Sequence, residues 1–147
     1  EIAGEDFVLA STDSGRAHWV ESLAIDMGVG MSFVYKQRVD GATTQVQAVQ
    51  ALVQGKRVII YDDMIRTGSS LLQAARAYLD SGALEVHAVA THALFPGQAL
   101  ERIRESGLIQ SLAVTDTHPR SRELESPYLR VTSIAPLLVQ HLKKSIH

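Results

Sequence analysis

The sequence has no cysteine among its 147 residues, and this absence excludes disulfides and thiolate metal sites. No apolar run approaches the roughly 20 residues that a membrane-spanning helix needs, and no secretory pattern opens the chain. An excess of one charge sign is also missing, since the formal net charge is −2 and both signs are spread along the chain. Electrostatics therefore gives no reason to expect nucleic acid or an anionic membrane as a partner. We expect a cytoplasmic protein.

The sequence does have enough apolar content for one core. With 46% hydrophobic residues, residues 1–147 suit a single domain. Short apolar runs alternate with helical patterns, which is typical of an α/β fold with a mostly parallel twisted sheet flanked by helices. Strands are expected at residues 7–10, 32–35, 57–61, 111–115 and 129–134, with a strand and loop at 85–95. Helices are expected at residues 16–28, 71–79, 96–104 and 134–146, and a loop at 116–127.

One long polar stretch, residues 36–55, interrupts this alternation. It has glycine and threonine early and no charge from Thr43 to Gln54. Because connections of this length are uncommon unless they have a function, we interpret the stretch as a candidate functional arm.

The stretch "VIIYDDMIRTGSS", residues 58–70, combines a buried strand with chemistry at its end. Ligands of open α/β sheets bind beyond the carboxyl ends of the strands, where Asp62 and Asp63 are expected. The run Thr67-Gly68-Ser69-Ser70 follows where a helix begins, so free N–H groups, the positive end of the helix dipole and three hydroxyls converge there. This combination predicts a phosphate site.

Carboxylates beside a phosphate site would repel the anion unless sugar hydroxyls or a magnesium ion lie between them. A phosphorylated sugar satisfies both halves of the motif. The alternative is structural, because aspartate and threonine are also favoured at turns and helix starts, and Asp63 and Thr67 could do no more than cap a turn and a helix.

The motif at residues 58–70 resembles the phosphoribosyl-diphosphate (PRPP) binding motif of type I phosphoribosyltransferases and ribose-phosphate diphosphokinases. Further segments resemble the carboxyl-terminal half of the diphosphokinases, the PRPP synthetases, in the same order along nearly the whole chain. These segments are "DSGRA" at 13–17, "YKQR" at 35–38, "ATHALFPGQALERI" at 90–103, "VTDTHP" at 114–119 and the closing "IAPLLVQHLKKSIH".

The resemblance implies a transferase that moves the β,γ-diphosphoryl group of ATP to the C1 hydroxyl of ribose 5-phosphate, with Mg²⁺, giving PRPP and AMP. It implies that Asp62 and Asp63 hold the ribose hydroxyls and that the loop of residues 67–70 binds the 5-phosphate. Lys36 and Arg38 match the basic residues of the mobile catalytic arm, where charge neutralisation and exclusion of water assist phosphoryl transfer.

The resemblance also places Asp13 near the diphosphate, through magnesium, in a loop that Ser14 and Gly15 shape. In the family, an amino-terminal half of similar fold contributes to the ATP and magnesium site and joins a neighbouring subunit. We therefore expect residues 1–147 to be the carboxyl-terminal half of a longer protein that forms a homo-oligomer, and the isolated domain to be inactive.

The sequence departs from the family pattern in two places. Arg66 stands where related motifs usually carry an acid or a threonine, and it would either pair with Asp62 or Asp63 or add positive charge near the sugar phosphate. After Lys36 and Arg38 the related enzymes usually carry further polar and acidic residues, whereas residues 42–54 here read "ATTQVQAVQALVQ". These departures keep open a non-catalytic regulatory or binding subunit. A nucleobase phosphoribosyltransferase is a further alternative, although no base-binding hood is evident.

Four other residues have structural interpretations. Asp13 would cap the helix that begins near Arg16. His92 is expected to hydrogen-bond to a neighbouring loop, and Trp19 to pack in the core or at an interface. His118 is expected to lie in a loop.

Overall fold

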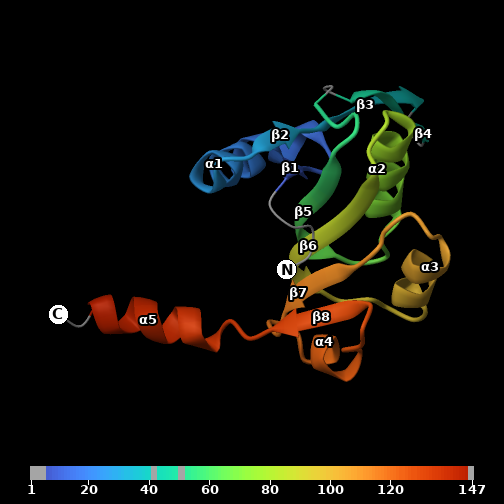
Figure 1. The fold of residues 1–147 in the computed structure, drawn as a ribbon. Coiled ribbons are helices and arrows are strands. Elements are labelled where there is room, and N and C mark those ends of the chain that lie inside the picture. Colours follow the sequence, from blue (N-terminus) through green and yellow to red (C-terminus); the bar gives the residue numbers. More distant parts are fainter. Residues whose placement is uncertain (1–5, 41–42, 50–51, 146–147) are drawn as a thin grey trace.

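The computed structural model describes the backbone of residues 6–40, 43–49 and 52–145, and the side chains of residues 6–34 and 52–144. Its centre is a six-stranded sheet in which every pair of neighbouring strands is parallel (Figure 1). The strands lie in the order β2 (Gly30–Ser32), β1 (Phe7–Ala10), β5 (Arg57–Ile65), β6 (Glu85–Ala93), β7 (Leu112–Thr115) and β8 (Leu129–Thr132). This arrangement confirms the predicted α/β class.

The order of the strands creates a switch point between β1 and β5. From β1 the chain passes through helix α1 (Ala17–Met27) to β2 on one side, and it then returns to β5 on the other side of β1. Ligands of open α/β sheets bind in the crevice at such a point, beyond the carboxyl ends of the two strands.

The two faces of the sheet have separate cores. Helices α2 (Ser69–Asp80) and α3 (Ala99–Glu105) contribute to the larger core through residues such as Tyr78 and Ile103, which are fully buried. Helix α1 covers the other face, where Val20 and Ala24 pack with Leu9 and Ile59. Side chains alternate between the two cores along β1 and β5, as the period of a strand requires. Because both strands are anchored on both faces, their carboxyl ends are held firmly.

The prediction of a strand at residues 32–35 was only partly right. Strand β2 ends at Ser32, and strand β3 (Val34–Asp40) pairs with β4 (Thr43–Val49) as an antiparallel two-stranded sheet outside the main one. The polar stretch at 36–55 thus contains much of a β-hairpin, which the β-branched residues of "TTQVQAV" favour. Residues 41–42 and 50–51 of the stretch lie outside the described residues.

Three other expected boundaries were wrong. Strand β5 continues to Ile65, because its pairing with β6 extends to Ile65 and Ala93, so the two aspartates lie within the strand and not after it. Helix α3 begins at Ala99 and not at Pro96. The segment expected as loop contains helix α4 (Pro119–Glu123), with proline at its first position and His118 as its N-cap.

The closing helix was predicted correctly as a helix, α5 (Ala135–Ser145), which extends away from the body of the domain (Figure 1). Its apolar residues do not enter the core, since every residue from 135 to 144 is exposed. Within the described residues, no helix combines the length and the apolar character that crossing a membrane requires.

Candidate functional site

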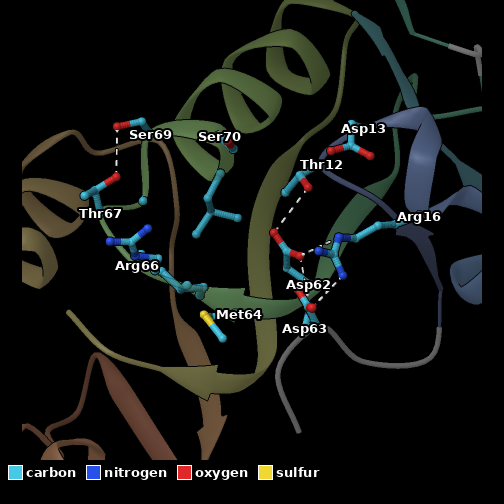
Figure 2. Close-up of a pocket in the computed structure, with 13 residues that line it drawn as sticks. Thr12, Asp13, Arg16, Asp62, Asp63, Met64, Arg66, Thr67, Ser69 and Ser70 are labelled. Atoms are coloured by element: carbon cyan, nitrogen blue, oxygen red, sulfur yellow. Dashed lines mark hydrogen bonds and ion pairs between the residues drawn. The ribbon is translucent and has the colours of Figure 1, made fainter. Parts of the chain in front are cut away.

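The candidate site lies at the switch point of the sheet, where the loop after β1 meets the end of β5. A cavity of about 540 Å³ opens there (Figure 2). Its lining consists of Thr12, Asp13 and Arg16 from the loop after β1, together with residues 62–71 from the end of β5 and the start of α2. The motif at residues 58–70 therefore supplies most of the lining of the cavity.

The two aspartates are tied to the loop after β1. Arg16 Nη1 lies 2.6 Å from Asp63 Oδ2, and Arg16 Nε lies 3.5 Å from Asp62 Oδ1. The Thr12 hydroxyl donates to Asp62 Oδ2 at 3.2 Å, and the Asp63 N–H donates to Asp62 Oδ1 at 2.9 Å. The residue that pairs with the aspartates is therefore Arg16, which the sequence analysis assigned only to the start of a helix.

The surroundings of the two aspartates shift their pKa values in opposite directions. Burial raises the pKa of Asp62, and the neighbouring Asp63 carboxylate raises it further, while Arg16 and Thr12 act in the opposite direction. Burial would also raise the pKa of Asp63, but the hydrogen bonds from Arg16 and Asp62 outweigh it and leave that pKa below its ordinary value. The hydrogen bond to Asp63 in turn raises the pKa of Arg16, so the guanidinium stays charged.

The other end of the cavity is the loop Thr67-Gly68-Ser69-Ser70, which we call the cradle. Gly68 is the N-cap of helix α2, with a φ of 82° and no side-chain cap. A Cβ at this position would lie 2.5 Å from Cδ1 of the buried Ile103, so both the backbone angle and the space require glycine. The cradle thus places an uncapped helix start at the cavity, as anion binding needs.

In a purely structural motif, the hydroxyl groups of the cradle would be expected to cap helix α2. Thr67 Oγ1 lies 3.2 Å from Ser69 Oγ, and neither side chain caps helix α2. The alternative in which Thr67 only caps the helix is therefore wrong. Asp63 Oδ2 pairs with Arg16, a contact that the capping of a turn would not require.

A buried hydrogen bond from helix α2 anchors the loop after β1. The Tyr78 hydroxyl donates to the Ser11 carbonyl at 2.7 Å, and the Ser11 hydroxyl donates to the Asp13 carbonyl at 2.6 Å. Asp13 Oδ1 accepts from the Gly15 N–H at 2.9 Å, so Asp13 caps the short 3₁₀ helix Ser14–Arg16. Asp13 therefore acts as a cap, but of the 3₁₀ helix that precedes α1 and not of α1 itself, whose N-cap is Arg16. The same residue lines the cavity.

Of the remaining candidate site residues with described side chains, only some line the cavity. Arg66 lines the cavity, but no ion pair joins it to either aspartate in the described part of the chain. Ser14 and Gly15 shape the loop of Asp13 without lining the cavity. Lys36 and Arg38 lie in strand β3, and their side chains are outside the described residues.

Three further expectations concern residues near the site. His92 Nδ1 lies 2.8 Å from Thr117 Oγ1, which confirms its hydrogen bond to a loop. Trp19 is 74% exposed, so it does not pack in the core, and its packing at an interface stays a prediction. His118 Nδ1 accepts from the Arg120 N–H at 3.3 Å, which makes this residue a helix cap instead of a simple loop residue.

The carboxylate of Asp13 is the group of the loop after β1 that could contact a magnesium ion in the cavity. Among the residues whose side chains are described, no group of three or more histidine, aspartate or glutamate side chains could hold a metal. Asp13 offers one carboxylate at the cavity, and its Oδ2 has no hydrogen bond within the described residues. Mg²⁺ in phosphoryl-transfer sites commonly uses one or two carboxylates, waters and substrate phosphates, so this residue fits such an ion.

Comparison with known proteins relates this geometry to a family. Ribose-phosphate pyrophosphokinase of Caldanaerobacter subterraneus subsp. tengcongensis is 36% identical over 137 residues, which are 93% of this chain and 43% of that protein. The crystal structure of phosphoribosylpyrophosphate synthetase from Mycobacterium smegmatis superimposes with a TM-score of 0.79 at 34% identity, covering 96% of this chain and 45% of that one. The chain thus spans less than half the length of these relatives.

Two further comparisons concern the fold and the family. A purine phosphoribosyltransferase from Pyrococcus horikoshii has a TM-score of 0.51 at 14% identity, covering 88% of this chain and 71% of that one, which supports the type I phosphoribosyltransferase fold alone. The family model described as the phosphoribosyl synthetase-associated domain matches residues 33–147. The chain therefore belongs to the phosphoribosyl synthetase-associated domain family.

Proposed function

We propose that the chain is the sugar-phosphate-binding half of a ribose-phosphate diphosphokinase. The complete protein would transfer the β,γ-diphosphoryl group of ATP to the C1 hydroxyl of ribose 5-phosphate, giving PRPP and AMP. One observation carries the proposal: the aspartate pair and the cradle line the same cavity, so one ligand with hydroxyls and a phosphate reaches both. The relatives, which are named for this activity, support it.

In this proposal the 5-phosphate occupies the cradle. The N–H groups at the start of α2 and the hydroxyls of Thr67, Ser69 and Ser70 would donate to its oxygens, and Gly68 would allow the close approach. Asp62 and Asp63 would accept hydrogen bonds from the ribose hydroxyls. The arginine at position 66 lines the cavity free of the aspartates, which favours its interaction with the phosphate over the pairing with an acid.

The transfer itself needs charge neutralisation around the migrating group. We assign that role to Lys36 and Arg38 of the arm, and the position next to Mg²⁺ to Asp13, with Ser14 and Gly15 shaping its loop. When bound, the metal would neutralise phosphate charge.

An upstream half and a homo-oligomeric partner would complete the ATP site, and residues 1–147 would be one domain of that protein. The cytoplasmic location stays a prediction from the sequence.

A second candidate function is a non-catalytic binding or regulatory subunit. The features that favour it are Arg66, where an acid or a threonine is usual, and residues 42–54 of the arm, which carry no acidic residue. The sugar phosphate would then bind without being converted.

Product analysis separates the two functions. The complete protein is incubated with ribose 5-phosphate, ATP and Mg²⁺, and AMP and PRPP are measured by chromatography. Formation of both in equal amounts is expected for the diphosphokinase. Binding of ribose 5-phosphate without AMP would instead establish the non-catalytic subunit.

The aspartate pair is tested by binding. The double variant Asp62→Asn/Asp63→Asn should bind ribose 5-phosphate at least about tenfold more weakly, because charge-assisted hydrogen bonds contribute more than neutral ones. Asp26→Asn/Asp80→Asn, two exposed residues outside the cavity, is the matched control and should bind like the wild type. Undiminished binding by the first variant would remove the sugar role of the pair.

Arg66 has its own test. If it contacts the sugar phosphate, Arg66→Asp raises the ribose 5-phosphate concentration needed for half-maximal rate and leaves turnover unchanged. An unchanged concentration contradicts the contact.

A further inference from the structure

The acids that are proposed to hold the ribose already have donors from within the chain. Three of the four carboxylate oxygens of Asp62 and Asp63 are engaged, by the Thr12 hydroxyl, the Asp63 N–H and the Arg16 guanidinium. A sugar hydroxyl can donate to these oxygens only in place of a present donor or beside it. Of the three donors, Thr12 is buried and the Asp63 N–H is part of the backbone, which leaves Arg16 as the movable one.

Arg16 is free enough to move. Its side chain is 44% exposed, and the shorter of its two ion pairs is with Asp63, whose side chain is 49% exposed. Ion pairs of this exposure are weak, since water competes for both charges. Arg16 also lines a second cavity of about 320 Å³ beside Trp19 and Tyr61, so space exists on that side of the aspartates.

The position of Arg16 relative to a bound sugar follows from the cavity. Figure 2 shows the cradle residues Thr67 and Ser69 on one side of the aspartates, and Asp13 and Arg16 on the other. With the 5-phosphate in the cradle and the hydroxyls on the aspartates, C1 of the ribose points away from the cradle, toward the loop that carries Asp13 and Arg16.

We propose that Arg16 selects for a ribose phosphate with an anionic group at C1, so that the site prefers PRPP over ribose 5-phosphate. The inference rests on the proposed function. When ribose 5-phosphate binds, the guanidinium loses its carboxylate partners and gains none from the C1 hydroxyl. When PRPP binds, the displaced guanidinium pairs with the C1 diphosphate, for which its planar donor fork is well suited.

Calorimetric titration of the complete protein tests this selection. Dissociation constants for ribose 5-phosphate and PRPP are measured at a fixed Mg²⁺ concentration, without ATP, for the wild type, Arg16→Ala and Arg16→Lys. In Arg16→Ala we expect the binding of ribose 5-phosphate to tighten and that of PRPP to weaken. The ratio of the two constants should change by about tenfold or more, the size of one charge-assisted hydrogen bond. Arg16→Lys keeps the charge and should restore part of the preference.

The control is Arg104→Ala, which removes an exposed arginine from an ion pair with Glu101 outside the cavity and should leave the ratio unchanged. A merely structural role of Arg16 would weaken both sugars together. If both bind and the ratio is the same in the wild type and Arg16→Ala, the selection by Arg16 is refuted while the proposed function stands. If neither sugar phosphate binds to any variant, the proposed function fails and this inference fails with it.

Discussion

The two ends of the cavity differ in how fully they are occupied by the chain itself. At the aspartate end, Arg16 and Thr12 donate to the carboxylates, and the pKa values of the two acids are shifted in opposite directions. At the cradle end, the hydroxyls of Thr67 and Ser69 bond only each other among the described residues, and the start of α2 has no side-chain cap. Under the proposed function, the cradle could accept the phosphate without losing a partner from the chain, whereas the aspartate end would exchange one partner for another.

The largest loss of stability is expected for a substitution of Gly68 in the cradle. Gly68→Ala would force a left-handed backbone angle on a residue with a Cβ and push that Cβ against Ile103. We expect the free energy of unfolding to fall by roughly 2–5 kcal/mol, the sum of the two strains. Chemical denaturation measures this loss, and phosphate binding should weaken with it.

Gly97→Ala is the matched control, because Gly97 also has a positive φ, of 56°, but no atom lies within 4 Å of its added Cβ. Its loss should be about 1–2 kcal/mol, from the backbone alone. Equal losses for the two variants would contradict the steric role of Gly68.

At the aspartate end, the buried donor Thr12 is the next most sensitive group. Thr12→Val keeps the shape and removes the hydrogen bond to Asp62 Oδ2, which is one of the contacts that lower the pKa of Asp62. We expect a loss of about 1.5–2 kcal/mol of unfolding free energy and a further rise of that pKa. Denaturation and carboxyl NMR titration measure the two effects. Thr12→Ser retains the donor, and a loss as large as that of Thr12→Val would show that the hydroxyl is unimportant.

A third carboxylate at the same edge of the sheet has structural partners only. Asp116 Oδ1 accepts from the Ile134 N–H at 2.9 Å and Oδ2 from Arg122 at 3.0 Å, which lowers its pKa to about 2. Because the folded pKa lies below the ordinary value of about 3.9, its stabilising effect is complete above about pH 4 and is lost as the pH falls toward 2.

Asp116→Asn should therefore be less stable than the wild type by a small amount at about pH 6, and the difference should shrink at about pH 3. Urea unfolding at a series of pH values measures it. A difference that is constant over this range would show that the charge of Asp116 is not involved.

Local sequence patterns predicted the cradle end better than the aspartate end. The cradle depends on neighbours in the chain, so the run of residues 67–70 before a helix was sufficient. The partner of the aspartates depends on β1 lying next to β5, and no local pattern shows which strands are neighbours. An arginine soon after the end of β1 becomes a candidate only when those two strands are paired. The length of β5 was missed for the same reason, since β6 sustains its last four residues.

Amide hydrogen exchange in helix α5 can report whether another part of the complete protein covers this helix. An isolated helix of 11 residues is marginal in water, and the described residues of α5 are all exposed. Its amide hydrogens should thus exchange with solvent rapidly, while those of β5, paired on both sides, exchange only through larger openings. Slow exchange in α5 within the complete protein would then identify the helix as covered, and mass spectrometry would read this state directly.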